Sequence, residues 1–241
     1  MKKSISVCLP TFNGSLYIEE QLLSILKQIG DDSEVIISDD NSTDDTLEII
    51  LGLNDPRIKL FRNKQTLGPV YNMEMALNHA NGEIIYMADQ DDVWFPDKIK
   101  VVTPLMDKYD LVITDAVVTD HLGNILYQSF FKVNFSGKGF IWNWINPSFM
   151  GCCMTFNRRI LNYCLPFPKN LVMHDSWIGL NTALFWKYCF LNQTLVYYRR
   201  HEKNVTNALK KNALPVIYQI LYRLKMMYQI IIRWVQRTGS V

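Results

Sequence analysis

The chain reveals its fold most clearly at residues 87–94, which read MADQDDVW. An apolar strand pattern runs here into three carboxylates within four residues, Asp89, Asp91 and Asp92. Like charges this close repel one another unless protons or a cation neutralise them. A hard divalent ion such as Mg²⁺ or Mn²⁺, which prefers carboxylate oxygens, would do so. The alternative is a solvated acidic turn that caps the following helix.

The segments on the N-terminal side of this stretch alternate between strand and helix patterns. Strands are predicted at residues 5–9, 34–38, 57–61 and 83–88, with helices at 16–26, from 43 onward and at 69–80. Such alternation predicts an α/β fold with a Rossmann-like, mostly parallel sheet flanked by helices. Ligands of such sheets bind beyond the carboxyl ends of the strands, which singles out the polar loops 10–14, 39–45 and 89–92.

The C-terminal half is less regular. Helices are predicted at residues 95–109, from 157 onward and at 175–187, and strands at 111–114, 152–156 and 195–198. Residues 115–150 are rich in turns and aromatic side chains, and their pattern does not order them into elements.

Composition narrows the class of protein. The 241 residues are 49% hydrophobic and 20% charged, which indicates one large globular domain or two intimate halves. A net charge of +2 gives no reason to expect a nucleic acid partner. The five cysteines contain no C-x-x-C pair, which favours a reducing, cytoplasmic setting. Neither a signal peptide nor a membrane-spanning helix is expected.

The loop at residues 38–45, SDDNSTDD, also follows a buried strand. Asp39 at its start could accept a hydrogen bond from a base N–H or from ribose hydroxyls. The alternative is that Asn41, Ser42 or Thr43 caps the next helix. Because different residues do each job, both interpretations can hold together.

Three segments together resemble glycosyltransferase family 2. They are VCLPTFN at residues 7–13, IISDDNSTD at 36–44 and DQDDVW at 89–94, and their order and spacing match over roughly residues 4–100. The resemblance implies a GT-A fold, a nucleoside-diphosphate sugar as donor (UDP or dTDP) and a Mg²⁺ or Mn²⁺ cofactor. It places Asp91 on the metal. The residues that it implies for the nucleotide sugar are Pro10, Thr11, Asn13, Asp39, Asn63, Gly68, Asn72, Asp89 and Gln90.

The catalytic base is expected in the C-terminal half, at the start of an element. Met173-His174-Asp175-Ser176-Trp177 resembles the family's segment in which the Asp takes the acceptor proton, so Asp175 is the predicted base. The alternative is that Asp175 only caps the helix. Residues on the acceptor side are predicted to be Gly151, Cys152, His174 and Trp177.

Residues 198–205, YRRHEKNV, resemble a segment of family members often described as rhamnosyltransferases. The resemblance makes Arg199 a contact to the nucleotide sugar, and His201 a contact to the diphosphate or its metal. The alternative is a solvated basic loop.

The C-terminal tail holds seven basic residues from position 203 onward and no acid. At 100° per residue its polar and basic side chains, which include Arg223 and Arg233, fall on one arc, and apolar side chains such as Leu224 and Ile231 fall on the other. A basic amphipathic helix indicates contact with an anionic membrane surface, here through residues 213–237. The alternatives are docking on the core or pairing in a homodimer.

These features predict a nucleotide-sugar-binding half at 1–110, an acceptor and catalytic half at 111–205, and a helical tail at 206–241. The predicted activity is metal-dependent, inverting sugar transfer to a glycan or lipid-linked acceptor in polysaccharide biosynthesis, with a rhamnosyl donor favoured. The place is the cytoplasm, peripheral at the inner face of the cell membrane. The alternatives are transfer of a UDP-hexose or UDP-N-acetylhexosamine unit and, more remotely, a sugar nucleotidyltransferase.

Overall fold

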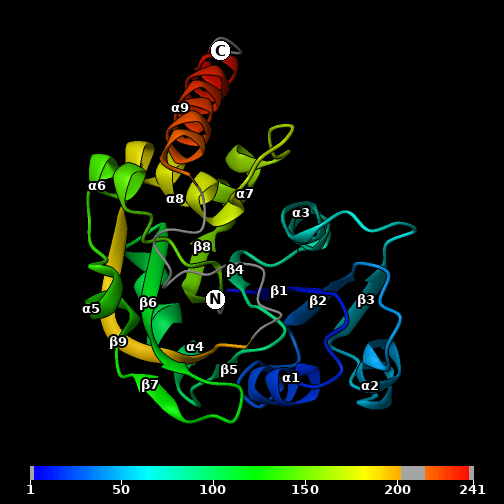
Figure 1. Cartoon of the computed structure of the whole chain (residues 1–241). Helices are drawn as coiled ribbons and strands as arrows, with labels where there is room; N and C mark the ends of the chain where they lie inside the picture. The colour runs from blue at the N-terminus through cyan, green and yellow to red at the C-terminus, as the bar shows by residue number, and fades with distance from the viewer. Residues whose placement is uncertain (1–2, 202–214, 239–241) are drawn as a thin grey trace.

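The computed structural model describes residues 3–201 and 215–238. One continuous sheet forms the centre, and its strand order is β3-β2-β1-β4-β8-β6-β9-β5 (Figure 1). The four strands of the N-terminal half pair in parallel: β1 (Ile5–Thr11), β2 (Glu34–Asp39), β3 (Ile58–Arg62) and β4 (Ile84–Met87).

The sheet continues into the C-terminal half of the chain. Its strands there are β5 (Val93–Trp94), β6 (Leu111–Thr119), β7 (Ile125–Tyr127), β8 (Met154–Asn157) and β9 (Tyr188–Arg199). β8 and β5 run antiparallel to their neighbours, β6 and β9 are parallel to each other, and β7 forms a hairpin with β6. The predicted α/β fold with a central sheet flanked by helices is therefore confirmed, whereas the sheet as a whole is mixed, because parallel pairing dominates only its N-terminal half.

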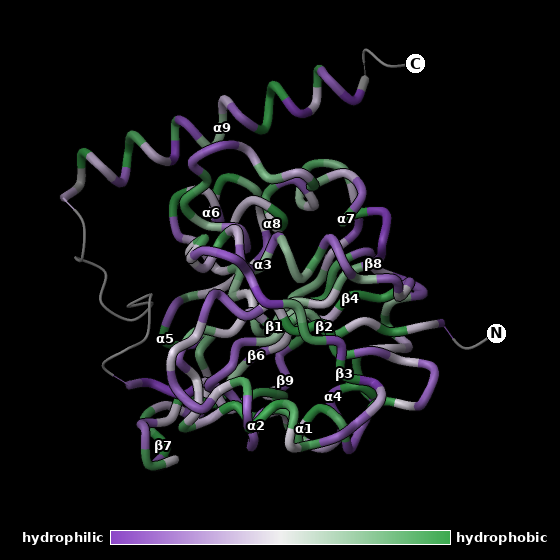
Figure 2. Tube along the Cα trace, turned by 90° about the vertical axis from the view of Figure 1, so that its right-hand side faces the viewer, coloured by the Kyte–Doolittle hydropathy of each residue, from purple (hydrophilic) through white to green (hydrophobic). Residues whose placement is uncertain are grey.

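Helices cover both faces of the parallel half. α1 (Ile18–Leu26) and α2 (Thr46–Gly52) lie on one face and α3 (Pro69–His79) on the other (Figures 1 and 2). The remaining elements are α4 (Lys98–Val102), a 3₁₀ turn (Thr103–Asp107), α5 (Phe130–Asn134), α6 (Phe140–Ile145), a second 3₁₀ turn (Gly151–Cys153), α7 (Arg158–Cys164), α8 (His174–Phe185) and α9 (Val216–Thr238).

Burial explains why the strands form. Val7, Leu9, Ile36, Ile37 and Ile85 are completely buried between the helical layers. β2 is buried at every position, as expected for a strand that is covered on both faces.

Several predicted elements have different bounds in the structure. The helix predicted at 95–109 is split, because Pro104 lacks the backbone N–H that a continuing α-helix needs. The strand predicted at 152–156 begins only at Met154, after a 3₁₀ turn. The two strands predicted at 111–114 and 195–198 are longer, because β6 and β9 pair with each other along most of their length.

The tail forms the predicted helix over Val216–Thr238, while residues 206–214 of the predicted tail lie outside the described residues. Within the part of the chain that is described, no helix is both long enough and apolar enough to span a membrane.

Candidate active site

The carboxyl ends of β1, β2 and β4 bring the three predicted loops to one edge of the sheet. Thr11 lies beside Asp39 in the β1–β2 register, and Cys8 lies beside Met87 in the β1–β4 register. Loops 10–14, 39–45 and 89–92 leave the sheet from these adjacent ends, so residues distant in sequence share one site.

The first loop is held against the second by its own backbone. Asn13 adopts a left-handed conformation (φ 47°), and its N–H donates to Ser42 Oγ at 2.9 Å. Its side-chain Oδ1 accepts from the N–H of Thr43 at 2.9 Å. Among non-glycine residues, Asn is one of those that most readily adopt the left-handed conformation, which explains why an Asn stands at position 13.

Gln90 connects the first loop to the third. Its side-chain amide accepts from the Phe12 N–H at 2.9 Å and donates to the Phe12 carbonyl at 3.1 Å. A Cβ at Gly14 would lie 2.2 Å from Gln90 Oε1, so glycine is needed for this approach. Gln90, predicted to contact the nucleotide sugar, therefore also holds two loops of the site together.

Asp39 is fully buried at the end of β2. Its carboxylate accepts from Thr11 Oγ1 at 3.0 Å, from Ser42 Oγ at 2.5 Å and from the Ser42 N–H at 2.9 Å. Arg62 Nε lies 3.9 Å from it. The side chain is thus fixed in one orientation beside the first loop.

The neighbouring Asp40 organises the segment that carries Gly68. Its carboxylate accepts from the N–H groups of Leu67 and Gly68, both at 2.8 Å, and from Asn63 Nδ2 at 3.1 Å. Asn63 also donates to Asn72 Oδ1 at 3.0 Å, and Asn72 Nδ2 donates to the Thr11 carbonyl at 3.0 Å. Asn63 and Asn72, predicted near the donor, are buried members of this network.

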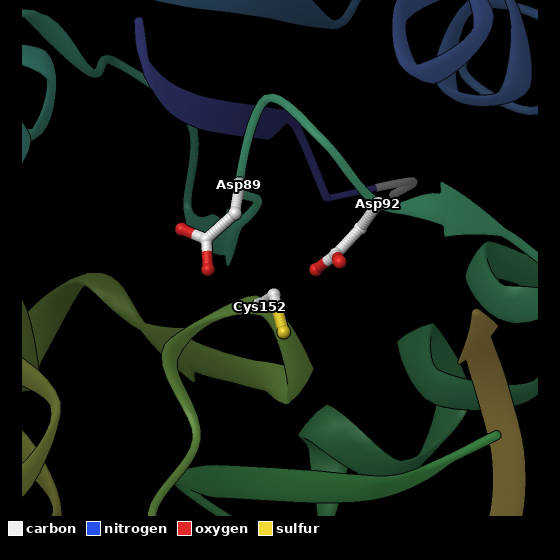
Figure 3. Close-up of side chains that lie close together, drawn as sticks. All are labelled: Asp89, Asp92 and Cys152. Atoms are coloured by element: carbon white, nitrogen blue, oxygen red, sulfur yellow. The ribbon is translucent and has the colours of Figure 1, made fainter. Parts of the chain in front are cut away.

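The third loop concentrates negative charge. Figure 3 shows Asp89 and Asp92 reaching from the loop after β4 toward Cys152, which belongs to the second half of the chain. The potential ligand atoms of these three residues lie within 4.8 Å of one another. Asp89 is half-buried, whereas Asp92 is buried and its Oδ1 accepts from the Arg199 N–H at 3.0 Å.

Electrostatics at this loop favour the protonated carboxyl groups. Burial raises the pKa of Asp89 to about 7, and the charges of Asp91 and Asp175 add to the shift. Burial likewise raises the pKa of Asp92, and Asp91 and Asp89 contribute next. The loop therefore holds charges that repel one another and that a bound cation would relieve.

The protein itself supplies one cation beneath the loop. Lys98 is fully buried, its Nζ donates to the Cys152 carbonyl at 2.8 Å, and it lies 4.2 Å from the centre of the Trp94 ring. Burial lowers the pKa of Lys98, and its negative surroundings, which include Asp92 and Asp89, oppose this shift. No sequence pattern marks Lys98 as a buried residue, because a lysine in the first turn of a helix is usually solvated.

Replacing Lys98 by Met is expected to destabilise the protein by about 2–3 kcal/mol, because a charged hydrogen bond is lost and the carbonyl of Cys152 is left unpaired. The change is measured as the free energy of unfolding in urea. The control is Lys100→Met on the exposed side of the same helix, for which less than about 0.5 kcal/mol is expected. Equal effects of the two substitutions would contradict the role of Lys98.

His201 and Arg199 close the site from the end of β9. His201 Nε2 lies 2.8 Å from Asp91 Oδ2, and its ring stacks on Tyr17 at 5.0 Å between centroids. The Arg199 guanidinium lies 4.9 Å from the centre of the same Tyr17 ring and forms an ion pair with Glu20 at 2.6 Å. The two predicted metal residues, Asp91 and His201, are therefore in direct contact. Residues 202–205 of the basic segment lie outside the described residues.

Asp175 enters the site from the first turn of α8. Its Oδ1 accepts a hydrogen bond from the backbone N–H of Ser176 at 2.6 Å. The residue at the N-cap position of α8 is Met173, not Asp175. The proposal that Asp175 merely caps the helix therefore does not describe its geometry. Burial raises the pKa of Asp175, while His174 and backbone N–H groups, including that of Gly151, oppose the shift.

Gly151 fits closely beside this pair. A Cβ on it would lie 3.3 Å from Met87 Cε, 3.5 Å from His174 Nε2 and 3.8 Å from the Asp175 Cβ. Burial lowers the pKa of His174, which favours its neutral form. Gly151 and His174 thus lie next to the predicted base.

Two of the residues predicted on the acceptor side have other surroundings. Trp177 is completely buried, its Nε1 donates to the Cys164 carbonyl at 3.0 Å, and Arg233 lies 5.3 Å from its ring centre. The prediction that Trp177 contacts the acceptor is therefore corrected, because helical periodicity turns it into the core. Cys152 is also buried and faces Asp89 and Asp92.

The potential metal-ligand atoms of the loop after β4 suit a hard divalent cation. Asp92 Oδ2 is buried and, in residues 3–201 and 215–238, has no hydrogen-bond partner. Asp89 and Asp91 offer half-buried carboxylates beside it, and oxygen ligands of this kind suit Mg²⁺ or Mn²⁺. The Cys152 thiol is unsuited to such an ion, because a hydrogen bond to Cys153 and burial raise its pKa.

Comparisons with known proteins agree with this geometry. The family model "Glycosyl transferase family 2" matches residues 6–165. A UDP-Glc:alpha-D-GlcNAc-diphosphoundecaprenol beta-1,3-glucosyltransferase, WfgD of Escherichia coli, is 32% identical over 107 residues, which are 44% of this chain and 42% of the relative. A GalNAc(5)-diNAcBac-PP-undecaprenol beta-1,3-glucosyltransferase of Campylobacter jejuni is 42% identical over 91 residues, 36% of this chain and 29% of the relative. The matches thus span less than half of either relative.

Solved structures share the fold. Residues 1–349 of Staphylococcus aureus TarS in complex with UDP-GlcNAc give a TM-score of 0.72 at 21% identity, covering 96% of this chain and 66% of that one. A mannosyltransferase of Pyrobaculum calidifontis in complex with GDP-Man and Mn²⁺ gives 0.64 at 18% identity, covering 100% and 76%.

The fold is therefore the GT-A fold of glycosyltransferases, as the three matched segments predicted. The chain belongs to glycosyl transferase family 2, since the family model covers well over half of its length.

Proposed function

We propose that this chain transfers a sugar, with inversion, from a nucleoside-diphosphate sugar to a hydroxyl group of a lipid-linked or glycan acceptor. The observation that carries the proposal is the meeting of two carboxylates from different halves of the chain. Asp89 follows β4, Asp175 lies in the first turn of α8, and the two are close enough that the charge of Asp175 raises the pKa of Asp89. One half thus supplies the donor side and the other the base.

The reaction divides among residues already described. The acceptor oxygen attacks C1 of the sugar, the bond from C1 to the diphosphate breaks, and the acceptor proton passes to Asp175. A bound Mg²⁺ or Mn²⁺ would stabilise the negative charge on the departing diphosphate. Asp89, Asp91 and Asp92 would hold that ion, together with His201, which contacts Asp91. Arg199 lies beside them at the end of β9.

Asp39 and the first loop are assigned to the nucleotide. The Asp39 carboxylate, fixed by Thr11 and Ser42, can accept from a ring N–H of a pyrimidine base. Pro10 and Asn13 line the same edge, while Asn63, Gly68 and Asn72 keep the adjoining segment in place through Asp40.

For the donor we favour a UDP-hexose, because two relatives are named as beta-1,3-glucosyltransferases and one of these names includes UDP-Glc. Both names also describe diphosphoundecaprenol-type acceptors, which supports a lipid-linked acceptor here. The rhamnosyl donor remains the alternative, on the resemblance of residues 198–205. We place the reaction on the cytoplasmic side of the membrane, in keeping with five free, buried cysteines.

Calorimetry and a donor screen test the proposal. UDP is expected to bind more tightly with Mn²⁺ than without it, and hydrolysis of UDP-hexoses is expected to exceed that of dTDP-rhamnose. Absence of nucleotide binding under any metal condition would refute the enzyme assignment, whereas preference for dTDP-rhamnose would refute only the favoured donor.

Metal binding is expected to depend on pH through Asp89. With a pKa of about 7 this carboxyl is mostly protonated at pH 6 and mostly ionised at pH 8. A cation must displace the proton, so Mn²⁺ affinity should rise roughly tenfold between these values. Calorimetry in the presence of UDP measures the change, and Asp89→Asn should flatten it relative to the wild type. A wild-type affinity that is constant with pH would contradict the assignment.

A further inference from the structure

Helix α9 is attached to the rest of the protein by a mixed side, on which Arg233 lies beside the buried apolar side chains of Met226 and Ile230. Arg233, only 8% exposed, donates to the carbonyls of Tyr163 at 2.6 Å and Leu165 at 3.0 Å, and also to that of Pro166. It also lies over the Trp177 ring. The basic arc of this helix thus contains an anchor of α9 to the domain.

Other polar residues extend this attachment along the helix. Arg237 Nη2 donates to the Asn162 carbonyl at 2.8 Å. Gln229 Nε2 donates to the carbonyl of Lys169 at 3.2 Å, and Lys225 Nζ donates to the carbonyl of Asn170 at 3.4 Å. Trp144 Nε1 of α6 donates to the backbone carbonyl of Arg223 at 3.1 Å.

The opposite side of α9 is a continuous apolar line. Six side chains form this line, each 52–64% exposed: Ile217, Leu221, Leu224, Tyr228, Ile231 and Val235. Their spacing of three or four residues places them on one face of the helix. Met226 and Ile230, half a turn away, are 3% and 2% exposed. In Figure 2, α9 runs along the outside of the molecule with alternating hydrophobic and hydrophilic segments. A helix that turns its apolar face outward presents a surface for another partner.

We propose that this apolar line, which we call the outer face of α9, inserts into the interface of an anionic lipid bilayer. Tyr218, Tyr228 and Trp234 are exposed along the helix, and such rings suit the boundary between acyl chains and headgroups. The segment from 203 to 241 carries seven bases and no acid, so it complements anionic headgroups.

The same charge pattern disfavours a second copy of this chain as the partner. A symmetric dimer through the outer face would bring together two copies of a segment that carries seven bases and no acid to pair with them. An anionic bilayer can bury the apolar line while its headgroups attract the net positive charge of the segment.

The placement also connects the membrane surface to the active site. Arg233 of α9 contacts Trp177 of α8, and α8 carries His174 and Asp175 in its first turn. A bilayer-bound α9 would therefore set the orientation of the catalytic side of the domain. The proposal goes beyond the proposed function, and it agrees with a lipid-linked acceptor without requiring one.

Sedimentation with vesicles tests the outer face. The wild-type chain is expected to sediment with vesicles of 30% phosphatidylglycerol in phosphatidylcholine. Leu224→Glu combined with Ile231→Glu should lower the partition coefficient at least tenfold. The matched control is Leu122→Glu combined with Leu126→Glu in the β6–β7 hairpin, where the two leucines are 75% and 49% exposed. This control adds the same charge and should sediment like the wild type.

Three outcomes would overturn the proposal. The wild type could fail to sediment, the α9 variant could sediment like the wild type, or light scattering could show a wild-type dimer that the α9 variant converts to a monomer without any vesicle binding. UDP calorimetry on all three proteins is the separate readout. Unchanged UDP affinity shows that the variants are folded, and a wild type that binds vesicles but not UDP would refute the proposed function alone.

Discussion

Replacing Asp175 by Asn is expected to reduce sugar transfer by about 10²–10⁴-fold, the contribution typical of a general base. UDP affinity should stay within about twofold of wild type, because the nucleotide is assigned to the other half of the chain. The measurement is the rate of product formation at saturating donor, with calorimetry on the same protein.

This substitution distinguishes catalysis from a structural role at the helix start. Asn can still accept from the Ser176 N–H through its side-chain oxygen, and it is as good a helix-capping residue as Asp. An unchanged melting temperature with lost transfer therefore supports the base, whereas normal turnover would show that the base lies elsewhere. Because burial raises the pKa of Asp175, wild-type kcat should fall on acidification with a midpoint above about 3.9.

Replacing Asp91 by Asn is expected to weaken UDP binding in the presence of Mn²⁺ by at least about tenfold, because one anionic ligand of the proposed ion is lost. UDP binding without metal should be nearly unchanged. Calorimetry with and without Mn²⁺ measures both quantities.

The control for this effect is Asp31→Asn, an exposed carboxylate before β2 at the opposite end of the strand. It removes the same charge and should leave both affinities as in wild type. If Asp91→Asn and Asp31→Asn behaved alike, the carboxylates after β4 would not be the metal site.

The sequence was most informative where strands end. Alternating strands and helices predict a parallel sheet, and the rule for its carboxyl ends places Asp39 and Asp89 at one edge without any coordinates. The position of Asp175 was predicted from the family resemblance, because its distance from β4 in the sequence gives no local pattern that joins them. The structure brings it near Asp89 through α8.

Residues that act through burial could not be predicted in this way. Lys98 and Asp40 are polar and lie in ordinary helix and loop patterns, yet the first is completely buried under the acidic loop and the second fixes the backbone of residues 67–68. Only tertiary packing decides whether such a side chain is solvated or enclosed.

The clearest difference between the sequence-based expectation and the structure concerns which side of α9 contacts the domain. The periodicity of the tail correctly separated an apolar arc from a basic one, but it could not show which arc meets the protein. Amphipathic helices usually bury the apolar face, whereas α9 buries Met226 and Ile230 and leaves most of its apolar arc exposed. Backbone carbonyls at residues 162–170 accept instead from Arg233 and its neighbours. The same arginine covers Trp177, which explains why that side chain is not available to an acceptor.

Anomalous scattering from crystals grown with UDP and Mn²⁺ is the most direct test of the active site. The carboxylates after β4 should hold a manganese peak about 2.1 Å from an oxygen of Asp91 and in contact with the diphosphate, with Asp175 across the cleft from the nucleotide. Bound UDP with no manganese near residues 89–92, or UDP bound away from β1, β2 and β4, would contradict the account.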